Sequence, residues 1–413
     1  MKICLIDNFR QYSPEMGGHA LRVPALIDTL LTSGHKVTVI HAGEDSFVKV
    51  ERGMRLLSIA PPGLLTSALD ALHPLIFPRR GHVKDSFILN LPNSLLKMRK
   101  EILDADLVQI EDPTLVGAFL LARLYNRPCI FDGDGITSQV ERVELDRGPR
   151  STKVRSIVTY VGAIICEKIA YRFASRIVTS SRRDKEYLTT LHGIDPSKVA
   201  IVPNPIGRNE DRVGLHLPDA GFVRQEHGLS DADNVVAFVG NLEAPHNKEA
   251  VEYIGNILAN DREVRESKVR FLIIGNFGEG QNEWEKYDLI FTGPVPDVRP
   301  YILASDVCIA PLMSQPTGVK TKVLTYLSCG KPTVATGFAL TGLDPTIRMF
   351  VDESDLTSFP KIMLSRLKLL GKNKEPDNEL VRQVMSIYSN ESVGLQYERD
   401  VLQPLLESSG PSA

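Results

Sequence analysis

The residues best suited to chemistry lie in a short loop about three quarters of the way along the chain. The loop contains, in chain order, Thr317, Gly318, Lys320 and Lys322. Apolar residues at helical spacing follow it, which predicts a helix that begins there and ends at Gly330. Unpaired backbone N–H groups and the helix dipole favour an anion at such a start, and the lysines add positive charge. The loop therefore predicts a diphosphate site, although any α/β connection can carry a glycine and solvated lysines.

The chain is long enough for two domains and has the composition of a globular protein. Its 413 residues exceed one ordinary core, and hydrophobic residues make up 43% and charged residues 24%. The formal net charge of −3 gives no basic stripe, so we expect no nucleic-acid partner. The five cysteines are scattered without a CxxC or Cys/His cluster, so we expect core residues in a reducing compartment and no metal site.

Short apolar runs alternate with helical segments along the chain, which predicts an α/β architecture with parallel sheets. The expected strands cover residues 2–7, 36–41, 106–110, 127–131, 175–179, 198–202, 235–240, 269–275, 289–292, 307–311 and 333–336. The strand pattern stops after residue 206 and returns at residue 235, which places a linker there. We therefore predict two Rossmann-like domains, residues 1–206 and 207–380, and a helical segment, residues 381–413, that packs back on the first domain.

Two features of the first half lie where an open parallel sheet binds ligands. Gly17 and Gly18 occupy the first strand-to-helix connection, where they allow close approach to the backbone or simply make a flexible turn. Glu111 and Asp112 follow the strand at 106–110. Asp112 precedes Pro113, which favours a helix-capping role for it. Glu111 has no such structural role and is the stronger candidate site residue.

The sequence favours a cytoplasmic protein, at most peripheral to the inner face of the membrane. The N-terminus passes directly into a strand without a signal-peptide pattern. The longest apolar run, residues 157–166, covers about ten residues, whereas about 20 are needed to span a bilayer. Residues 58–84 are rich in proline and leucine, and basic residues outnumber acids around them. Two interpretations of this segment stay open, an ordinary subdomain with a solvated face and a contact with anionic lipid headgroups.

The order of these motifs resembles the group 1 retaining glycosyltransferases of the GT-B fold, also called family 4. The stretch MGGHALRVPALIDTLLTSGHKVTVI is similar to the Gly-Gly loop, helix and strand that open the family's first domain. ASRIVTSSRRDKEYL and VAIVPNPIG resemble the end of that domain. FVGNLEAPHNKEAVEYI, VRFLIIGNFGEG, IFTGPVPDVRPYILASDVCIAPL and GVKTKVLTYLSCGKPTVATGFALTGL resemble the second domain in the right order. The resemblance covers nearly the whole chain.

The resemblance implies a GT-B fold in which two Rossmann-like domains face a central cleft. It also implies a nucleoside diphosphate sugar as donor, held mainly by the second domain, and a hydroxyl acceptor held by the first. No metal or other cofactor is implied, since backbone amides and lysines neutralise the departing diphosphate. Glu111 and Lys322 are the catalytic candidates. The donor-binding candidates are Gly17, Gly18, Gly240, Asn241, Gly293, Val295, Thr317, Gly318, Lys320 and Thr325.

The sequence departs from the family pattern at three places. Many relatives carry a Glu-x7-Glu pair where this chain has Thr317 and Thr325, and threonine makes a weaker hydrogen bond than a carboxylate. Asn241 and His246 occupy positions where relatives often carry arginine and lysine. Glu111 occupies the position of a catalytic histidine found in some relatives. These departures put the identity of the donor in doubt.

Three functions are compatible with this pattern. The first is a retaining transferase that moves a sugar to a hydroxyl of a glycan, a polysaccharide, a lipid-linked acceptor or a small molecule. The second is a non-catalytic GT-B paralogue that acts as partner or scaffold of an active transferase, prompted by the missing acids. The third is another GT-B chemistry, such as a nucleotide-sugar 2-epimerase. The first is the prediction, and the type of product distinguishes it from the other two.

Overall fold

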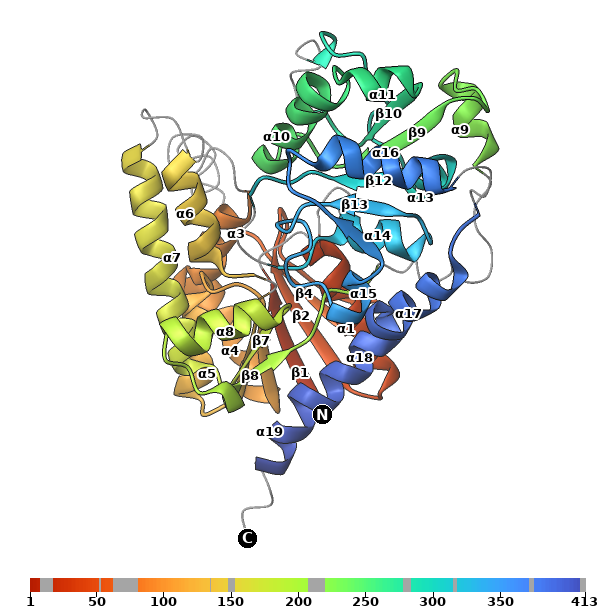
Figure 1. Cartoon of the computed structure of the whole chain (residues 1–413). Coiled ribbons are helices and arrows are strands. Elements are labelled where there is room, and N and C mark those ends of the chain that lie inside the picture. Colours follow the sequence, from red (N-terminus) through yellow and green to blue (C-terminus); the bar gives the residue numbers. More distant parts are fainter. Residues whose placement is uncertain are drawn as a thin grey trace. The chain divides into compact units, whose positions relative to one another are not determined.

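The computed structural model describes residues 1–7, 18–51, 53–61, 81–133, 135–147, 153–206, 220–277, 284–314, 318–370 and 375–408. The chain divides into two compact units (Figure 1). Unit 1 comprises Met1–Pro205 together with Asn390–Ala413, and unit 2 comprises Ile206–Ser389. Each unit has its own parallel sheet, as the alternating sequence pattern predicts.

Unit 1 is built on an eight-stranded sheet with the strand order β3-β4-β2-β1-β5-β6-β7-β8. Its strands are β1 Lys2–Asp7, β2 Lys36–Ala42, β3 Phe47–Glu51, β4 Met54–Ile59, β5 Leu107–Ile110, β6 Cys129–Gly133, β7 Arg176–Thr179 and β8 Val199–Ile201. Neighbouring strands pair in parallel except β3, which pairs antiparallel with β4. In chain order, β2 to β4 lie on one side of β1, and β5 to β8 lie on its other side. The carboxyl ends of β1 and β5 therefore flank the point where ligands bind in such sheets.

Helices cover both faces of this sheet. They are α1 Gly18–Thr32, α3 Gly81–Asn90, α4 Pro92–Asp104, α5 Val116–Leu124, α6 Thr137–Arg147, α7 Lys153–Phe173 and α8 Arg182–Leu191. Side chains alternate along β1, so that Cys4 and Ile6 join the core under α4, α5 and α7. Ile3 and Leu5 join the opposite core, which α1 shares with the C-terminal helices.

The C-terminal residues complete the second of these cores. They form α18 Asn390–Tyr397, a π-helical turn η4 Glu398–Leu402 and α19 Gln403–Ser408. Helix α18 contacts α1, as predicted for the end of the chain. Gly394 allows this approach, because a Cβ atom there would lie 2.2 Å from Oγ1 of Thr29.

Unit 2 is built on a six-stranded parallel sheet with the order β11-β10-β9-β12-β13-β14. Its strands are β9 Asn234–Val239, β10 Val269–Ile274, β11 Ile290–Phe291, β12 Val307–Ala310, β13 Thr333–Ala335 and β14 Val351–Glu353. Its helices are α9 Gly221–Glu226, α10 Pro245–Tyr253 with its π-helical extension η3 Ile254–Leu258, α11 Arg262–Glu266, α13 Arg299–Ala304, α14 Thr321–Ser328, α15 Pro345–Arg348, α16 Phe359–Leu370 and α17 Asn378–Tyr388. In chain order, β10 and β11 lie on one side of β9, and β12 to β14 lie on its other side. The carboxyl ends of β9 and β12 therefore flank the ligand-binding position of this sheet.

The structure differs from the sequence prediction at the C-terminal segment. The predicted helical segment is not continuous, because Ser389 adopts an extended conformation between α17 and α18. Helix α17 belongs to unit 2, where Asp377 caps its start and donates a backbone hydrogen bond of 2.9 Å to the carbonyl of Gly330. The segment that packs on the first unit therefore begins at Asn390 and not at residue 381.

The structure also bears on the expectations about the cysteines, membrane-spanning helices, metal ligands and the segment 58–84. Four cysteines are buried and Cys166 is half-buried, and none forms a disulfide. Within the described ranges, no helix is both long enough and apolar enough to cross a bilayer. The same ranges contain no group of three His, Cys, Asp or Glu side chains able to hold a metal ion. Most of the segment 58–84 lies outside the described residues, so its proposed lipid contact stays a hypothesis.

Candidate functional site

The candidate site of unit 2 starts at the carboxyl end of β9. Gly240 follows this strand, and a Cβ atom at this position would lie 2.9 Å from Cγ of Asn247. The absence of a side chain lets Asn247 pack against the strand end from the first turn of α10, where it is 5% exposed. Its Nδ2 donates to the carbonyl of Asn241 at 2.8 Å, and its Oδ1 accepts from Nζ of Lys322 at 2.5 Å. Asn247 therefore joins the β9 loop to α14.

Lys322 is held close to apolar and cationic groups. Its Nζ lies 4.1 Å from the ring centroid of Phe238, which permits a cation–π contact. Burial, and to a lesser degree the charge of Lys320, together lower the pKa of Lys322 to about 7. An anion arriving beside this ammonium would favour its charged form. Lys322 is thus placed to gain energy from a negatively charged ligand.

Lys320 belongs to the same loop and is 5% exposed. It occupies the N-cap position of α14 without a capping side-chain hydrogen bond, and its Nζ donates to the carbonyl of Gly318 at 3.1 Å. Gly318 has a φ of 73°, a conformation that favours glycine. The loop thus places two lysine side chains at the amino end of α14, as the sequence predicts.

His246 adds an imidazole to this cluster from the first turn of α10. Burial is the main cause that lowers its pKa to about 3, and the charges of Lys322 and Lys320 act in the same direction. The ring is therefore neutral at physiological pH and can donate or accept a hydrogen bond without adding charge. We name Lys320, Lys322, His246 and Asn247 the lysine cluster.

The other predicted donor-binding residues lie around this cluster or in the neighbouring strand ends. Gly293, with a φ of 76°, accepts at its carbonyl from the backbone N–H of Gly275 at 3.2 Å. Gly275 in turn approaches Gly240, because a Cβ atom on Gly275 would lie 2.3 Å from the carbonyl oxygen of Gly240. Val295 packs half-buried against the core of unit 2. The ends of β9, β10 and β11 are thus adjacent.

Of the two threonines that stand where relatives carry acids, the structure describes one. Thr325 is 7% exposed, and its Oγ1 donates to the carbonyl of Thr321 at 3.0 Å within α14. Its hydroxyl is therefore engaged with its own helix. Thr317 lies outside the described residues, as does Gly17 of unit 1. Gly18 is described and forms the first residue of α1.

Asn247 is the residue that sequence reasoning missed. It lies in the first turn of α10, which begins at Pro245. Proline is favoured in the first turn of a helix, and this signal was present in the sequence. Lys248 lies with its Nζ 5.6 Å from the ring centroid of Trp284.

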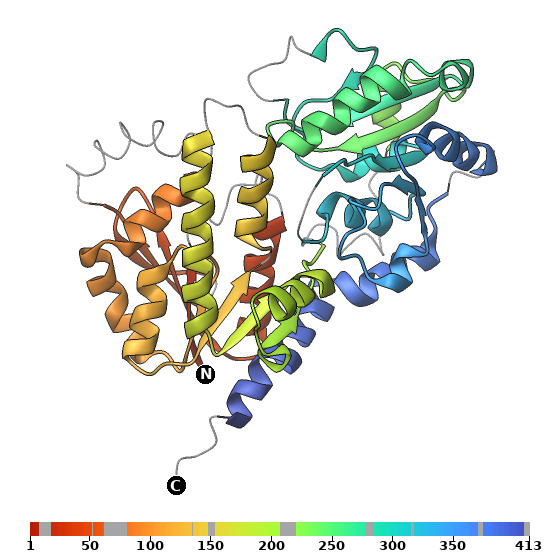
Figure 2. The same cartoon turned by 60° about the vertical axis from the view of Figure 1, so that its left-hand side comes forward.

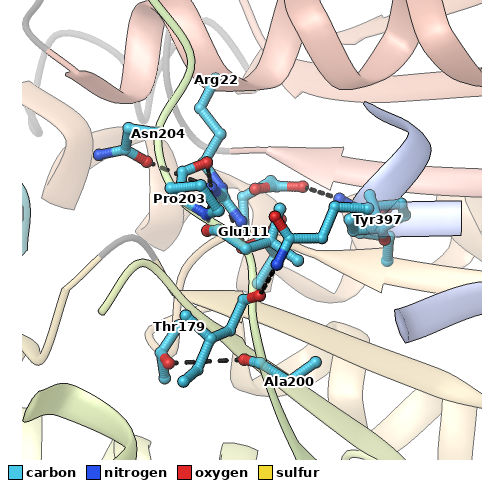
Figure 3. Close-up of polar contacts among 12 residues, drawn as sticks. Arg22, Glu111, Thr179, Ala200, Pro203, Asn204 and Tyr397 are labelled. Carbon is cyan, nitrogen blue, oxygen red and sulfur yellow. Dashed lines mark hydrogen bonds and ion pairs between the residues drawn. The ribbon is translucent and has the colours of Figure 1, made fainter. Parts of the chain in front are cut away.

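The candidate site residue of unit 1, Glu111, lies at the end of β5 in a buried polar network (Figure 3). Its Oε1 accepts from Nε2 of Gln109 at 2.6 Å, and Oε1 of Gln109 accepts from the hydroxyl of Tyr397 at 2.6 Å. Burial raises the pKa of Tyr397 well above its usual value, so the hydroxyl stays protonated as a donor. Glu111 is therefore held in place from α18, which lies far along the chain.

The same network contains a buried ion pair. Arg22 of α1 and Asp132 of β6 are both fully buried, and Nη2 of Arg22 lies 2.8 Å from Oδ1 of Asp132. Nη1 of Arg22 donates to the carbonyls of Val202 and Pro203 and, at 3.2 Å, to Oδ1 of Asn204 (Figure 3). Asn204 thus has a structural contact within unit 1. Arg22 ties the start of α1 to the residues that follow β8.

Comparisons with known proteins gave matches over most of the chain. A family model described as Glycosyltransferase Family 4 matches residues 16–209, and one described as Glycosyl transferases group 1 matches residues 233–367. Among curated proteins, none matches the sequence significantly.

Many solved structures have the same fold, including three whose chains are covered almost completely. HepE from Anabaena, in complex with UDP, is 15% identical with a TM-score of 0.64, and the match covers 97% of this chain and 100% of that one. Sucrose-phosphate synthase from Thermosynechococcus elongatus is 14% identical with a TM-score of 0.66 and coverage of 99% and 100%. A trehalose-6-phosphate protein from E. coli, bound with UDP-2-fluoro glucose, is 12% identical with a TM-score of 0.65 and coverage of 98% and 99%. These likenesses confirm the predicted fold.

Proposed function

Because the chain belongs to the group 1 (family 4) glycosyltransferases and has the GT-B fold, we propose that it transfers a sugar from a nucleoside diphosphate sugar to a hydroxyl acceptor, with retention of anomeric configuration. The observation that carries this proposal is the lysine cluster at the carboxyl end of β9 and the amino end of α14. Two lysines beside an uncapped helix start are suited to a diphosphate, whose charge they balance.

The lysine cluster would act on the leaving group. In the transfer, the bond between the anomeric carbon and the phosphate oxygen breaks, and negative charge develops on the diphosphate. Lys320 and Lys322, with the backbone amides of α14, stabilise that charge as preorganised donors. His246 stays neutral and offers the diphosphate or the sugar a hydrogen bond. In this proposal the cations of the chain take the part that a divalent ion has in many other transferases.

The acceptor would attack from the face that the diphosphate leaves, which retains the anomeric configuration. Its hydroxyl oxygen forms the new bond to the anomeric carbon, and its proton passes to the departing phosphate oxygen. The products are a glycoside and a nucleoside diphosphate. Glu111 orients the acceptor or the sugar, and its fixed position in the network with Gln109 and Tyr397 supports this role.

The first test is donor binding and turnover with UDP-glucose, chosen because structures of HepE contain UDP or UDP-glucose. At 100 times its dissociation constant, the donor should stabilise the protein by about 2.7 kcal/mol in a thermal-shift experiment. Lys320→Met and Lys322→Met together should remove that shift. Lys286→Met is the matched control, because this exposed lysine of unit 2 lies against Tyr287 and outside the cluster.

Turnover separates the remaining functions. An active transferase releases a nucleoside diphosphate and a glycoside whose anomeric configuration, read by NMR, matches that of the donor. Binding without any turnover, including slow hydrolysis, across the common sugar nucleotides would identify the non-catalytic paralogue. A free, altered sugar nucleotide would identify an epimerase. Binding that is unchanged in the double lysine variant would refute the assignment of the site.

Donor binding should take up a proton at alkaline pH. The free protein has a Lys322 pKa of about 7, and a bound diphosphate raises it because the opposite charge favours the ammonium. At pH 8 most of the free Lys322 is neutral, so binding should take up close to one proton, and at pH 6 close to none. Affinity should accordingly fall as pH rises above 7. Calorimetry of UDP-glucose binding in buffers of different ionisation enthalpy measures this uptake.

The variant Lys322→Met controls the proton experiment. Any uptake that persists in this variant at pH 8 arises from another group and contradicts the assignment. A sugar nucleotide is preferable to a free nucleoside diphosphate, because the terminal phosphate of the latter itself titrates near neutral pH.

A further inference from the structure

Helix α7 exposes a continuous row of branched aliphatic side chains. Val154, Ile157, Val158, Val161 and Ile165 are 77%, 45%, 66%, 46% and 53% exposed. Their spacing of three, one, three and four residues places them on one side of the helix. The row spans about 17 Å at 1.5 Å per residue. Figure 2 shows α7 as a long helix at the outside of unit 1. A stable soluble protein rarely leaves such a row in water.

Basic residues lie at both ends of this row. Lys153 precedes it, and Lys168 and Arg172 follow it on the same side of the helix, all three exposed. The acidic residue of α7, Glu167, is 1% exposed and points away, with its Oε1 accepting from the backbone N–H of Ser138 at 2.9 Å. The solvent side of α7 is therefore aliphatic and positively charged, without an acid.

Two neighbouring helices, α5 and α4, extend the same chemistry, whereas α6, which also contacts α7, exposes Asp146 paired with Arg142. Helix α5 contacts both α7 and α4. It exposes Leu120 and Leu124, which are 50% and 71% exposed, with Arg123 between them. Helix α4 exposes Leu96, at 67%, with the basic residues Lys97, Arg99 and Lys100. The exposed acid of these three helices, Asp104, is paired with Lys2. We call the outer side of α4, α5 and α7 the basic aliphatic face.

We propose that the basic aliphatic face lies on the surface of an anionic lipid bilayer. Aliphatic side chains that enter the region between headgroups and acyl chains, flanked by cations that meet anionic headgroups, are typical of helices that lie in a membrane surface. The length and burial of α7 fit this arrangement, because its opposite side is packed on the core of unit 1 through Ala163, Ala170 and Tyr171. The residues of this face come from other parts of the sequence than the segment 58–84.

Charge distinguishes the bilayer from a second copy of the chain as occupant. If two α7 helices packed in antiparallel orientation, Lys153 of each would approach Lys168 and Arg172 of the other. A parallel pairing would bring identical cations together. In both cases like charges of α7 meet and α7 itself presents no exposed acid to balance them, which costs free energy. An anionic bilayer offers the complementary charge instead.

Vesicle flotation tests the proposal with the full chain. The intact protein should float with vesicles of phosphatidylcholine and phosphatidylglycerol and should bind pure phosphatidylcholine far more weakly. Lys168→Gln with Arg172→Gln should weaken the partition coefficient on the mixed vesicles about 25-fold, from about fivefold for each cation. Ile157→Ser with Val161→Ser should weaken it about tenfold or more. High salt should weaken binding of the intact protein, because it screens the cations.

Helix α16 of unit 2 supplies matched controls. Leu369 is 78% exposed, and Lys361 and Lys368 are exposed on the same helix. Leu369→Ser and the pair Lys361→Gln with Lys368→Gln should leave vesicle binding unchanged. Circular dichroism checks that each variant is folded, and the charge-only variant keeps the aliphatic row intact.

Three results would overturn the proposal. The first is absence of binding to the mixed vesicles, and the second is equal binding to neutral vesicles. The third is a dimer in sedimentation velocity that Ile157→Ser with Val161→Ser dissociates, without any vesicle binding, which would assign the face to self-association. None of these results depends on donor binding, so the proposal fails or stands separately from the proposed transferase activity.

Discussion

Replacing Arg22 with methionine is expected to lower the free energy of unfolding of unit 1 by about 3 to 5 kcal/mol. Asp132 would keep a carboxylate in a fully buried position without its ion-pair partner. The carbonyls of Val202 and Pro203 would also lose a donor. Breaking one partner of a buried pair costs more than the pair contributes, because the remaining charge stays desolvated. Hydrogen exchange of the amides in α1, β6 and β8 measures the loss within unit 1.

Two further variants make the Arg22 result decisive. Arg22→Met combined with Asp132→Leu should recover part of the loss, because no isolated charge then remains. Arg262→Met breaks an exposed pair with Glu266, in which Arg262 is 89% exposed, and should cost less than about 1 kcal/mol. If Arg22→Met costs no more than Arg262→Met, the buried network does not stabilise unit 1.

Lys322→Met is expected to act in opposite directions on stability and function. It should abolish the donor-induced shift and also raise the free energy of unfolding of unit 2 by on the order of 2 kcal/mol at neutral pH. Burial lowers the pKa of Lys322 from 10.5 to about 7, so the folded protein carries a disfavoured charge. Methionine has a similar length and carries no charge, although the contact with Asn247 is lost.

The pH dependence of this effect follows from proton binding. Between pH 7 and pH 10.5 the unfolded chain keeps the Lys322 proton and the folded chain releases it. The amount by which Lys322 lowers the free energy of unfolding therefore decreases as pH rises. The gain from Lys322→Met should therefore be largest at or below pH 7 and smaller at pH 9. Trp284 is the single tryptophan of the chain and is buried in unit 2, so its fluorescence reports this transition.

Lys286→Met provides the reference for this prediction, since Lys286 is exposed. It should change stability little at either pH. A Lys322→Met variant that is less stable than the parent, or equally stabilised at pH 7 and pH 9, would show that burial of the ammonium carries no cost. Where a binding group is held in an unfavourable environment, replacing it is expected to raise the free energy of unfolding and to abolish ligand binding.

Local residue patterns predicted most of the strands, the two α/β units and the lysine loop, but they missed β3, β4 and β14. The strands follow from short apolar runs between polar turns, because a strand buried in a parallel sheet needs apolar side chains on both faces. The expected β1 at residues 2–7 has the observed bounds. The loop at Gly318 follows from glycine and lysines before a helical pattern, and its positive φ is a local property.

The tertiary structure decided which distant residues meet. Lys322 and Asn247 are 75 residues apart in sequence, and Gln109 and Tyr397 are 288 apart, so no local pattern could pair them. The same holds for α17, which the contact between Asp377 and Gly330 assigns to unit 2 although its helical pattern continues towards α18. Hydrophobic periodicity in the sequence shows only that a helix has an apolar side. The packing of the whole unit decides whether other elements cover that side. For α7, packing covers Ala163 and Ala170 and leaves the aliphatic row in solvent.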